Sequence, residues 1–345
     1  MKRAILSIFV LVPLGAAAFL GYRLWDERKF AATQFGEGTR SVVIPPRTGP
    51  HQLAQLLAKA GIVSDPQRFY VHLHYFRRKA HPRAGEYEFE GPQFPDEVIG
   101  KLDRGEVKLY RFTVPEGLRA DEIAPIVGAT GICAADEFFK LARDPALAKK
   151  LGVPAPGLEG FLYPDTYSVP RGVGCMGIVQ AMVARFRDEW KKADAHRAPD
   201  VKLDELQAVT LASIVEKETG QPEERPRISC VFHNRLKKGM RLGTDPTVIY
   251  SVLLENNFKW DGNLHKTDLL RPHPYNTYMV KGLPPGPISN PGAAAMEAAL
   301  NPIHCNDYFF VSRNDHTHVF CPDLACHEAN VRKWQIEYFQ HRKRG

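Results

Sequence analysis

Hydrophobic and polar positions alternate along the chain with two different periods. In several stretches apolar residues recur every three or four positions, which is typical of amphipathic helices, while shorter stretches alternate residue by residue, as half-buried strands do. The pattern therefore predicts an α+β fold. Helices are expected over residues 52–60, 66–77, 95–104, 120–128, 177–193, 204–219 and 226–238. Three more are expected: one that begins at Pro246, one that ends at Leu300 and one that begins at Glu328. Strands are expected over residues 41–44, 84–89, 109–114, 308–312 and 318–320.

The N-terminal residues form a long apolar run. Lys2 and Arg3 precede apolar residues from Ala4 to Leu20, which is close to the lower limit of about 17 residues for a transmembrane helix. Positive charge ahead of the run predicts a cytoplasmic N-terminus with the remaining chain outside. The alternative is a signal peptide cleaved at the alanines of residues 16–18. We favour an uncleaved anchor over residues 1–25, because the apolar run continues past those alanines.

The remaining chain divides into a linker and two domains. Residues 26–39 are charged and polar and predict a juxtamembrane linker. Residues 40–107, in which short strands bracket helices, predict a small domain without an evident catalytic constellation. Residues 108–345 predict a larger, helix-rich domain with peripheral β-strands. The expected architecture is thus a transmembrane helix followed by a small and a large α+β domain.

The helix predicted before Gly220 contains a carboxylate among bulky apolar residues. At about 100° per residue, Glu218 falls beside Ile214 and Val215, whereas Glu216 points to a different side. The two acids are therefore not equivalent. Glu218 is the one expected in apolar surroundings.

The position of Glu218 within this helix has chemical consequences. Asp204 is a good N-cap and Gly220 a good stop signal, so Glu218 lies in the last turn, at the negative end of the helix dipole. Apolar surroundings and the dipole both disfavour the charged form and raise the pKa of a carboxyl group. Such a group can protonate a leaving oxygen and then act as a base. The structural alternative is that Glu218 pairs with a Lys or Arg at the helix end.

Composition and charge limit the classes of ligand that the protein is expected to bind. The 345 residues are 44% hydrophobic and 25% charged, which is ordinary for globular domains. The net charge of +7 is modest and no dense basic stripe carries interleaved aromatic residues, so nucleic acid is not expected as a partner. The basic character is compatible with anionic lipid headgroups or an acidic polymer.

Export would place the cysteines where disulfides persist. We expect a disulfide from Cys305 to Cys321 or Cys326, a second between Cys133 and Cys175, and a buried free thiol at position 230. Zinc is the alternative for the C-terminal cysteines, because His316, His318 and His327 lie nearby. The spacing of the cysteines is not a tight zinc signature, so no metal site is predicted.

Six motifs over most of the chain, from about residue 40 onward, resemble one known family in order and spacing. They are EGFLYPDTY at 159–167, LASIVEKET at 211–219, VFHNRL at 231–236, GMRLGTDPTVIY at 239–250, YNTY at 275–278 and GLPPGPISNPG at 282–292. The chain is identified on these motifs as resembling the YceG-like family, whose best-known members are endolytic murein transglycosylases.

The resemblance implies a location, a domain type and partners. Family members are anchored in the inner membrane by a single pass, with the catalytic part in the periplasm. Residues 40–107 would correspond to a LysM-like domain, a module type associated with glycan binding. The implied partners are peptidoglycan glycan strands, the inner membrane and peptidoglycan synthases, and no cofactor is implied.

The resemblance also implies a catalytic residue, the second glutamate of the EKE motif, here Glu218. Such enzymes cleave the bond between N-acetylmuramic acid and N-acetylglucosamine without water, leaving a 1,6-anhydro ring. One carboxylate suffices because the attacking 6-hydroxyl is tethered within the substrate. Substrate-binding residues are expected in the aromatic and polar motifs, namely Glu159, Tyr163, Thr244, Asp245, Tyr250, Tyr275, Asn276 and Tyr278.

Two further functions remain open on the sequence. A hydrolase of the same substrate would need a second carboxyl group, for which Asp245, Glu223 and Glu159 are candidates. A non-catalytic wall-binding scaffold would use the helix carboxylate only for structure. A zinc enzyme is a third, less favoured alternative.

Overall fold

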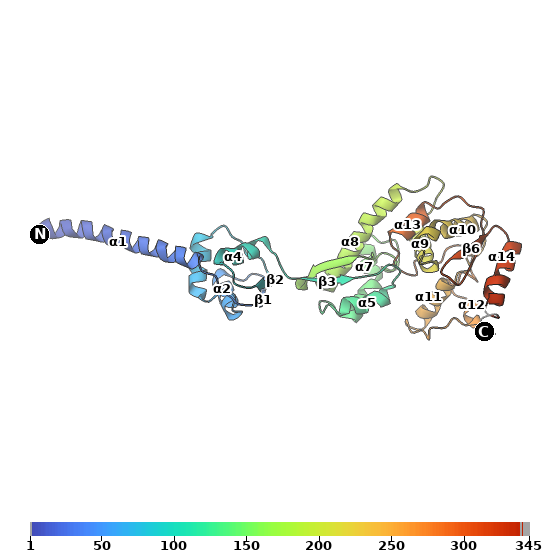
Figure 1. Ribbon diagram of the computed structural model, residues 1–345, viewed down its shortest axis with the longest axis horizontal. Helices are drawn as coiled ribbons and strands as arrows, with labels where there is room; N and C mark the ends of the chain where they lie inside the picture. The colour runs from blue at the N-terminus through green and yellow to red at the C-terminus, as the bar shows by residue number, and fades with distance from the viewer. Residues whose placement is uncertain (1, 339, 341–345) are drawn as a thin grey trace. The chain divides into compact units, whose positions relative to one another are not determined.

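The computed structural model describes residues 2–338 and 340, with the backbone alone for residues 2–12 (Figure 1). The chain forms two compact units: residues 1–110 with 168–172 make unit 1, and residues 111–167 with 173–345 make unit 2. In the described residues the strands pair into three two-stranded sheets, β1 with β2, β3 with β4, and β5 with β6. The α+β class predicted from the sequence is confirmed.

Unit 1 contains short helices and one antiparallel strand pair. Its elements are α1 (Lys2–Ala31), β1 (Thr39–Ile44), α2 (Pro50–Lys59), α3 (Pro66–Val71), a π-helical turn (His72–Phe76), β2 (Gly85–Glu90) and α4 (Pro95–Arg104). In the register of the sheet Val42 lies opposite Tyr87. The core lies where Ile44 of β1, Leu57 of α2 and Leu102 of α4 meet.

The C-terminal end of α1 belongs to unit 1. Phe30 is buried in its core, and the carboxylate of Asp26 lies 2.9 Å from Arg68. The stretch predicted as a linker at 26–39 therefore begins as helix, because α1 continues to Ala31 and packs against this core. Among the residues that the structure describes, no helix is both long and apolar enough to cross a membrane. The side chains of residues 1–12, on which much of the predicted anchor depends, lie outside the described residues.

Unit 2 is helix-rich, with short strands. Its elements, together with the shared strands, are β3 (Leu109–Thr113), α5 (Ala120–Gly128), α6 (Ala135–Ala142), α7 (Pro145–Lys150), β4 (Thr166–Pro170), α8 (Gly174–Ala195), α9 (Glu205–Glu218), α10 (Arg225–Lys237), α11 (Asp245–Glu255), α12 (Lys266–Leu269), α13 (Ala293–Leu300), β5 (Phe309–Ser312), β6 (His318–Cys321) and α14 (Leu324–Val331). Short 3-10 turns lie at Arg171–Val173 and Pro222–Glu224, and a π-helical turn at Arg332–Glu337.

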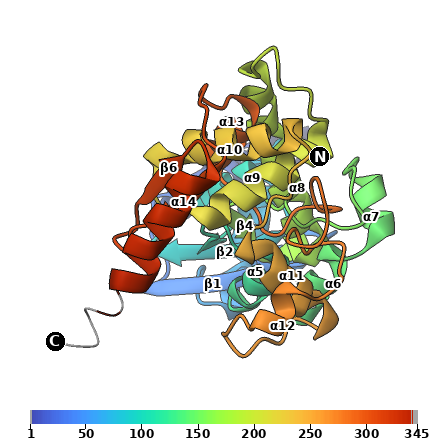
Figure 2. The same cartoon turned by 90° about the vertical axis from the view of Figure 1, so that its right-hand side faces the viewer.

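Helix α9 lies at the centre of unit 2. Figure 2 shows it beside α10, with α11 on its other side, and it also packs against α13. All residues from Ala208 to Val215 are buried, so the helix is enclosed rather than amphipathic. Its start is fixed by a capping box, in which Asp204 Oδ1 accepts from the Gln207 amide at 2.8 Å and Gln207 Oε1 accepts from the Asp204 amide at 3.0 Å.

The disulfides correct part of the sequence prediction. Cys133 pairs with Cys175, as predicted, but the expected bond from Cys305 to the C-terminal cysteines is wrong. Cys305 pairs with Cys230, which is therefore not a free thiol, and the last two cysteines, Cys321 and Cys326, pair with each other.

The reason for this pairing is the way α10 contacts the segment before β5. The side-chain amide of Asn234 donates to the carbonyl oxygens of Cys305 and Asp307, each at 3.0 Å. Arg235 Nε donates to the Tyr308 carbonyl at 2.7 Å. These bonds hold Cys305 over Cys230, one helical turn before Asn234.

Candidate active site

A cavity of about 760 Å³ opens at the C-terminal end of α9, and Glu218 lines it. The other polar residues of its wall come from α10 and the loop after it, from the N-terminus of α11 and from segments distant in sequence: Arg235, Arg241, Thr244, Asp245, Tyr278, Lys281 and His327. Aromatic side chains of β5, Phe309 and Phe310, supply an apolar wall. The cavity therefore brings one helix-end carboxyl group together with several polar groups and aromatic faces.

Glu218 is partly exposed to this cavity and otherwise surrounded by protein. Desolvation raises the pKa of its carboxyl group, and the nearby charge of Asp245 raises it further. Thr244, His318 and Arg235 act in the opposite direction. The net shift is upward, in the direction that the apolar neighbours on α9 predict.

Thr244 is held in place by its backbone, and its hydroxyl group lies beside Glu218. It is the N-cap residue of α11, and its amide donates to Thr277 Oγ1 at 3.1 Å. Its own hydroxyl is buried and lies within hydrogen-bonding reach of Glu218, where it lowers the pKa of that carboxyl group. A hydroxyl beside a carboxyl group in the wall of a cavity is suited to contact a ligand.

The remaining polar residues of the cavity are fixed by their neighbours. The Tyr278 hydroxyl donates to Asp245 Oδ1 at 2.7 Å, and burial raises the pKa of Tyr278. The Arg235 guanidinium donates to the carbonyl oxygens of Leu242 and Tyr308 and lies over the Phe309 ring. These contacts hold the loop before α11 and strand β5 in place around Glu218.

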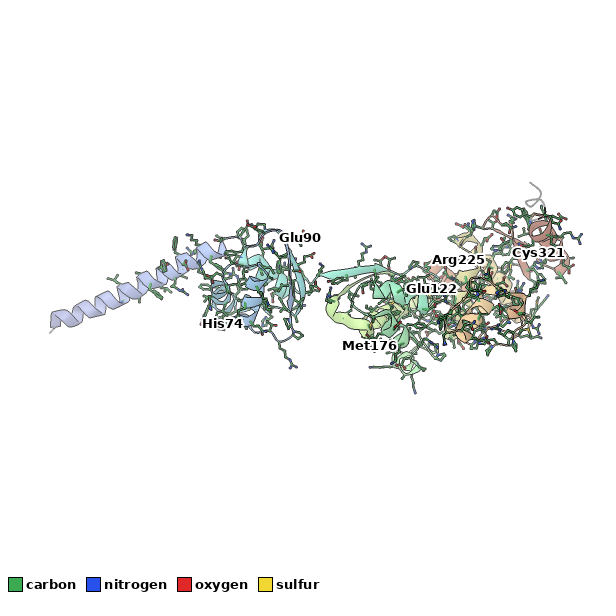
Figure 3. All side chains as sticks on the ribbon, turned by 90° about the horizontal axis from the view of Figure 1, so that it is seen from below. His74, Glu90, Glu122, Met176, Arg225 and Cys321 are labelled. Atoms are coloured by element: carbon green, nitrogen blue, oxygen red, sulfur yellow. A yellow bond between two sulfur atoms is a disulfide. The ribbon has the colours of Figure 1, made fainter. Side chains whose placement is uncertain are left out.

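Glu216, the other acid of the EKE motif, has a different environment. Its carboxylate pairs with Arg225 Nη2 at 2.7 Å and accepts from the Gly292 amide at 3.1 Å (Figure 3 marks Arg225). Burial raises the pKa of Glu216, while the Gly292 amide and Arg225 lower it. Glu216 thus links α9 to the start of α10 and to the residue before α13, and it does not line the cavity.

Glu159, Tyr250 and Tyr275, which are predicted from the sequence to bind substrate, form a separate cluster in which Tyr250 is buried and the other two are partly buried. Glu159 accepts from the Ala120 amide at 3.2 Å, from Asn290 Nδ2 at 2.8 Å and from the Tyr250 hydroxyl at 3.4 Å. The rings of Tyr250 and Tyr275 lie 5.0 Å apart. Burial raises the pKa of Glu159 to about 8. The contacts of this cluster join α5, α11 and the loop that precedes α13.

Tyr163 and Asn276 are also placed away from the cavity. Tyr163 is buried, with the Arg185 guanidinium over its ring at 5.4 Å, and burial raises its pKa to about 12. Asn276 is fully buried, and its side-chain amide donates to three carbonyl oxygens of residues 268, 269 and 271. Of the predicted site residues, the cavity brings together Glu218, Thr244, Asp245 and Tyr278.

Several residues of the cavity carry no role in the sequence analysis. Arg235 and Arg241 lie inside two of the family motifs, shortly after Glu218 in the sequence. Their place in these motifs could have identified them as site residues. Lys281, Phe309 and His327 lie outside those motifs. Only the packing of β5 and α14 brings the last two to the cavity.

The histidines and cysteines considered for zinc do not form a ligand set in the described part of the chain. No group of three or more His, Cys, Asp or Glu side chains there is placed to hold a metal ion. Cys321 and Cys326 are joined as a disulfide, and His318 Nδ1 lies 2.7 Å from the Glu224 carboxylate. The geometry therefore offers no support for the zinc alternative.

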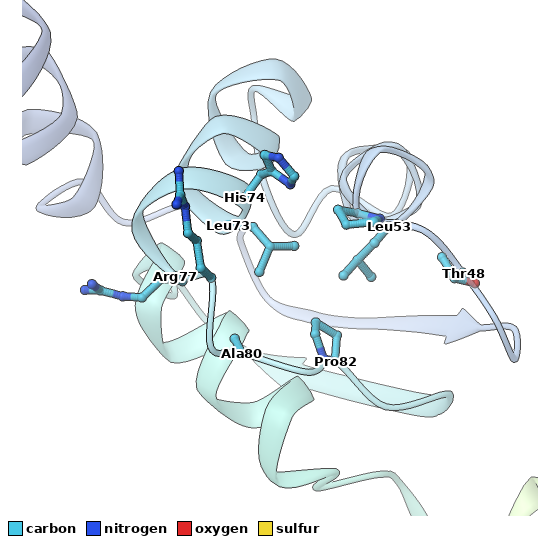
Figure 4. Close-up of a pocket in the computed structure, with 9 residues that line it drawn as sticks. Thr48, Leu53, Leu73, His74, Arg77, Ala80 and Pro82 are labelled. Carbon is cyan, nitrogen blue, oxygen red and sulfur yellow. The ribbon is translucent and has the colours of Figure 1, made fainter.

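Unit 1 contains a smaller cavity of about 360 Å³ (Figure 4). Leu53, Leu73 and Pro82 form its apolar part, and the side chains of His74 and Arg77 border it. No described acidic residue lines it. This cavity can hold a ligand but lacks a carboxyl group for acid–base chemistry.

A protonatable carboxyl group in an open cavity is the arrangement of a general acid–base enzyme. The sequence model of the YceG-like family matches residues 42–333 of the chain. This chain therefore belongs to the YceG-like family.

Three similar proteins extend this result. The endolytic murein transglycosylase of Bacillus subtilis is 28% identical over 86% of this chain and 85% of the relative. That of Streptococcus pneumoniae serotype 2 is 27% identical over 90% of this chain, which corresponds to 61% of the relative's length. The crystal structure of a yceG-like protein from Listeria monocytogenes is similar with a TM-score of 0.54 and 29% identity, over 84% of this chain and 98% of that one.

Proposed function

We propose that this chain is an endolytic murein transglycosylase, which cleaves glycan strands between N-acetylmuramic acid and N-acetylglucosamine. The observation that carries the proposal is Glu218, a carboxyl group of raised pKa at the edge of an open cavity. The names of the Bacillus and Streptococcus relatives support the same activity. Cleavage inside nascent strands would limit their elongation.

The proposed reaction uses one proton twice. Protonated Glu218 gives its proton to the glycosidic oxygen as the bond to the muramoyl anomeric carbon breaks. The resulting carboxylate takes the proton of the muramoyl 6-hydroxyl, whose oxygen bonds to the same anomeric carbon and closes a 1,6-anhydro ring. The hydroxyl group of Thr244 lies beside the acid in the wall of the same cavity, where a sugar substituent would contact it. The enzyme returns to its starting protonation state without consuming water.

Asp245 supports a second candidate function, that of a hydrolase. It is the only one of the three acids considered for a second carboxyl role that lines the described cavity. A hydrolase would use Asp245 as a base that activates water. The product distinguishes the two reactions, because hydrolysis leaves a reducing end whereas the lytic reaction releases fragments lighter by one water.

Replacing Glu218 with glutamine tests the proposal. Glutamine keeps the shape and polarity but cannot deliver a proton, so the rate of strand cleavage should fall by about 10²- to 10⁴-fold. Purified glycan strands are digested with both proteins and the products are weighed by mass spectrometry. Glu223→Gln, at an exposed position of the 3-10 turn before α10, is the matched control and should cleave normally. Full activity of Glu218→Gln would favour the non-catalytic scaffold.

The proposal includes a location and partners for the molecule. The chain would be a single-pass protein of the inner membrane, with both units in the periplasm, next to nascent glycan strands and the synthases that make them. The apolar run after Lys2 and Arg3 supports this location, and so do the disulfides, which persist in oxidising compartments. The LysM-like part would lie within unit 1, where the cavity of Figure 4 is the place to look for glycan binding.

A further inference from the structure

Two cationic side chains of the active-site cavity have no partner. Arg241 and Lys281 line the cavity that contains Glu218, and both are exposed. Neither side chain makes an ion pair or a hydrogen bond with any residue that the structure describes. Two arginines of α10, by contrast, are occupied: Arg227 pairs with Asp307 at 2.8 Å and Arg225 pairs with Glu216.

None of the described acids of the cavity forms an ion pair with these two cations. The raised pKa of Glu218 favours its neutral form. Asp245 accepts a hydrogen bond from the Tyr278 hydroxyl at 2.7 Å. Arg235, the third cation of the wall, donates to backbone carbonyl oxygens. The charged donors that remain available to a ligand are therefore those of Arg241 and Lys281.

A buried polar atom shows that the same cavity is built for a polar ligand. His327 Nδ1 is buried and has no hydrogen-bond partner among the described residues, and burial lowers the pKa of this histidine. A buried polar atom without a partner is costly, so such atoms mark places where a ligand or a water completes the hydrogen bonding.

We propose that Arg241 and Lys281 form an anion subsite that binds a carboxylate of the substrate beside the sugar whose bond is cleaved. This inference rests on the proposed function, and it adds a determinant of substrate choice. In murein the carboxylate has two sources, the peptide attached to the muramic acid or the lactyl group of muramic acid where the peptide is absent. Both present the same chemistry to a guanidinium and an ammonium group, which bind carboxylates by charge-assisted hydrogen bonds.

The test compares the wild type with the double variant Arg241→Gln/Lys281→Gln on three glycan substrates. The first carries intact peptides, the second has been stripped of peptides and exposes lactyl carboxylates, and the third has its carboxyl groups converted to amides. We expect the KM of the double variant to rise about 10-fold on at least one charged substrate, with little change in kcat. On the amidated strands the two proteins should have the same KM.

A charge-matched control separates this effect from the loss of positive charge in general. Lys149→Gln/Lys150→Gln removes two exposed lysines of α7, which do not line the cavity, and should leave the KM unchanged. A rise in KM on peptide-bearing strands alone assigns the subsite to the peptide, and a rise on stripped strands alone assigns it to the lactyl group.

Two results would overturn the inference. One is an unchanged KM of the double variant on both charged substrates, and the other is an equal rise on the amidated strands. Failure of the proposed function looks different, because the wild type would then release no anhydro product from any substrate.

Discussion

Glu216 and Glu218 stand two positions apart on α9 and meet different groups. Arg225 and the Gly292 amide hold the carboxylate of Glu216, so it contributes to the packing of α9. Glu218 faces the cavity beside the hydroxyl group of Thr244. Helical periodicity predicts this separation, because a shift of two residues turns a side chain by about 200° around the axis. Of these two acids, only Glu218 is placed to exchange a proton with a substrate.

The pH dependence of cleavage should report the pKa of Glu218. Its protonated form donates the first proton, so kcat/KM should fall as pH rises through a pKa above the ordinary value of 4.5. The Thr244 hydroxyl lowers this pKa, and the variant Thr244→Val should therefore move the falling limb to higher pH. Profiles of kcat/KM against pH for both proteins provide the measurement. A limb that moves to lower pH would contradict the assignment.

Glu159 should make stability depend on pH. Its pKa is about 8 in the folded chain against an ordinary 4.5, so the folded state holds the proton over a range in which the unfolded state has released it. The free energy of unfolding should fall as pH rises between these values, by up to about 1.4 kcal/mol per pH unit. Glu159→Gln keeps the hydrogen-bonding shape and should flatten this slope.

Denaturant unfolding at several pH values measures that slope for each protein. Glu137→Gln, at an exposed position of α6, is the control and should retain the slope of the wild type. Identical slopes for all three proteins would mean that Glu159 is ionised in the folded state.

At the scale of elements, α9 depends on its first turn as well as on its buried centre. Asp204→Ala removes the side-chain half of the capping box and should lower the free energy of unfolding by about 1 kcal/mol. Asp188→Ala, at an exposed site of α8, should change it by less than about 0.5 kcal/mol. The two variants are compared by urea denaturation. An equal loss of stability in both variants would mean that the Asp204 cap does not stabilise α9.

The two disulfides near the wall of the cavity should contribute different amounts to the free energy of unfolding. Cys230–Cys305 closes a sequence separation of 75 residues and Cys321–Cys326 one of 5 residues. Loop-closure entropy grows with loop length, so replacing the first pair with alanines should cost roughly 2 kcal/mol more than replacing the second. Thermal or denaturant unfolding of the two double variants provides the comparison, and a larger loss for Cys321→Ala/Cys326→Ala would contradict it.

Elements with strong periodicity and clear end signals could be predicted from sequence. The helices over 95–104 and 120–128 have the predicted bounds, and α9 begins at the predicted cap. The short helices α6 and α7 and strand β4 were not predicted, because segments of five to eight residues carry too few periods to stand out.

Contacts between residues that are distant in sequence determine the features that the sequence pattern could not predict. The partner of Cys305 depends on how α10 meets the segment before β5, which no spacing of cysteines encodes. The motifs likewise identify Thr244 and Asn276 as polar residues of interest. They do not say that the first lines the cavity while the second hydrogen-bonds the backbone of its own loop.

At the scale of the whole molecule, the proposed anchor can be removed without disturbing unit 1. A variant lacking residues 4–20 keeps Asp26 and Phe30, through which α1 packs against that unit. We expect the full chain to remain with membranes after alkaline extraction and the shortened chain to be released, with a far-UV circular dichroism spectrum typical of a folded protein. Release of the full chain under the same conditions would refute the anchor.

The chain passes three times between its units, and this affects the order in which they can form. Residues 168–172 belong to unit 1, where Arg171 donates to the Tyr110 hydroxyl at 2.7 Å and pairs with Glu86 at 2.9 Å. During synthesis from the N-terminus, residues 111–167 of unit 2 emerge before this last piece. Unit 1 is therefore completed only after the nascent chain has already delivered the beginning of its neighbour, so the two units mature in overlapping steps.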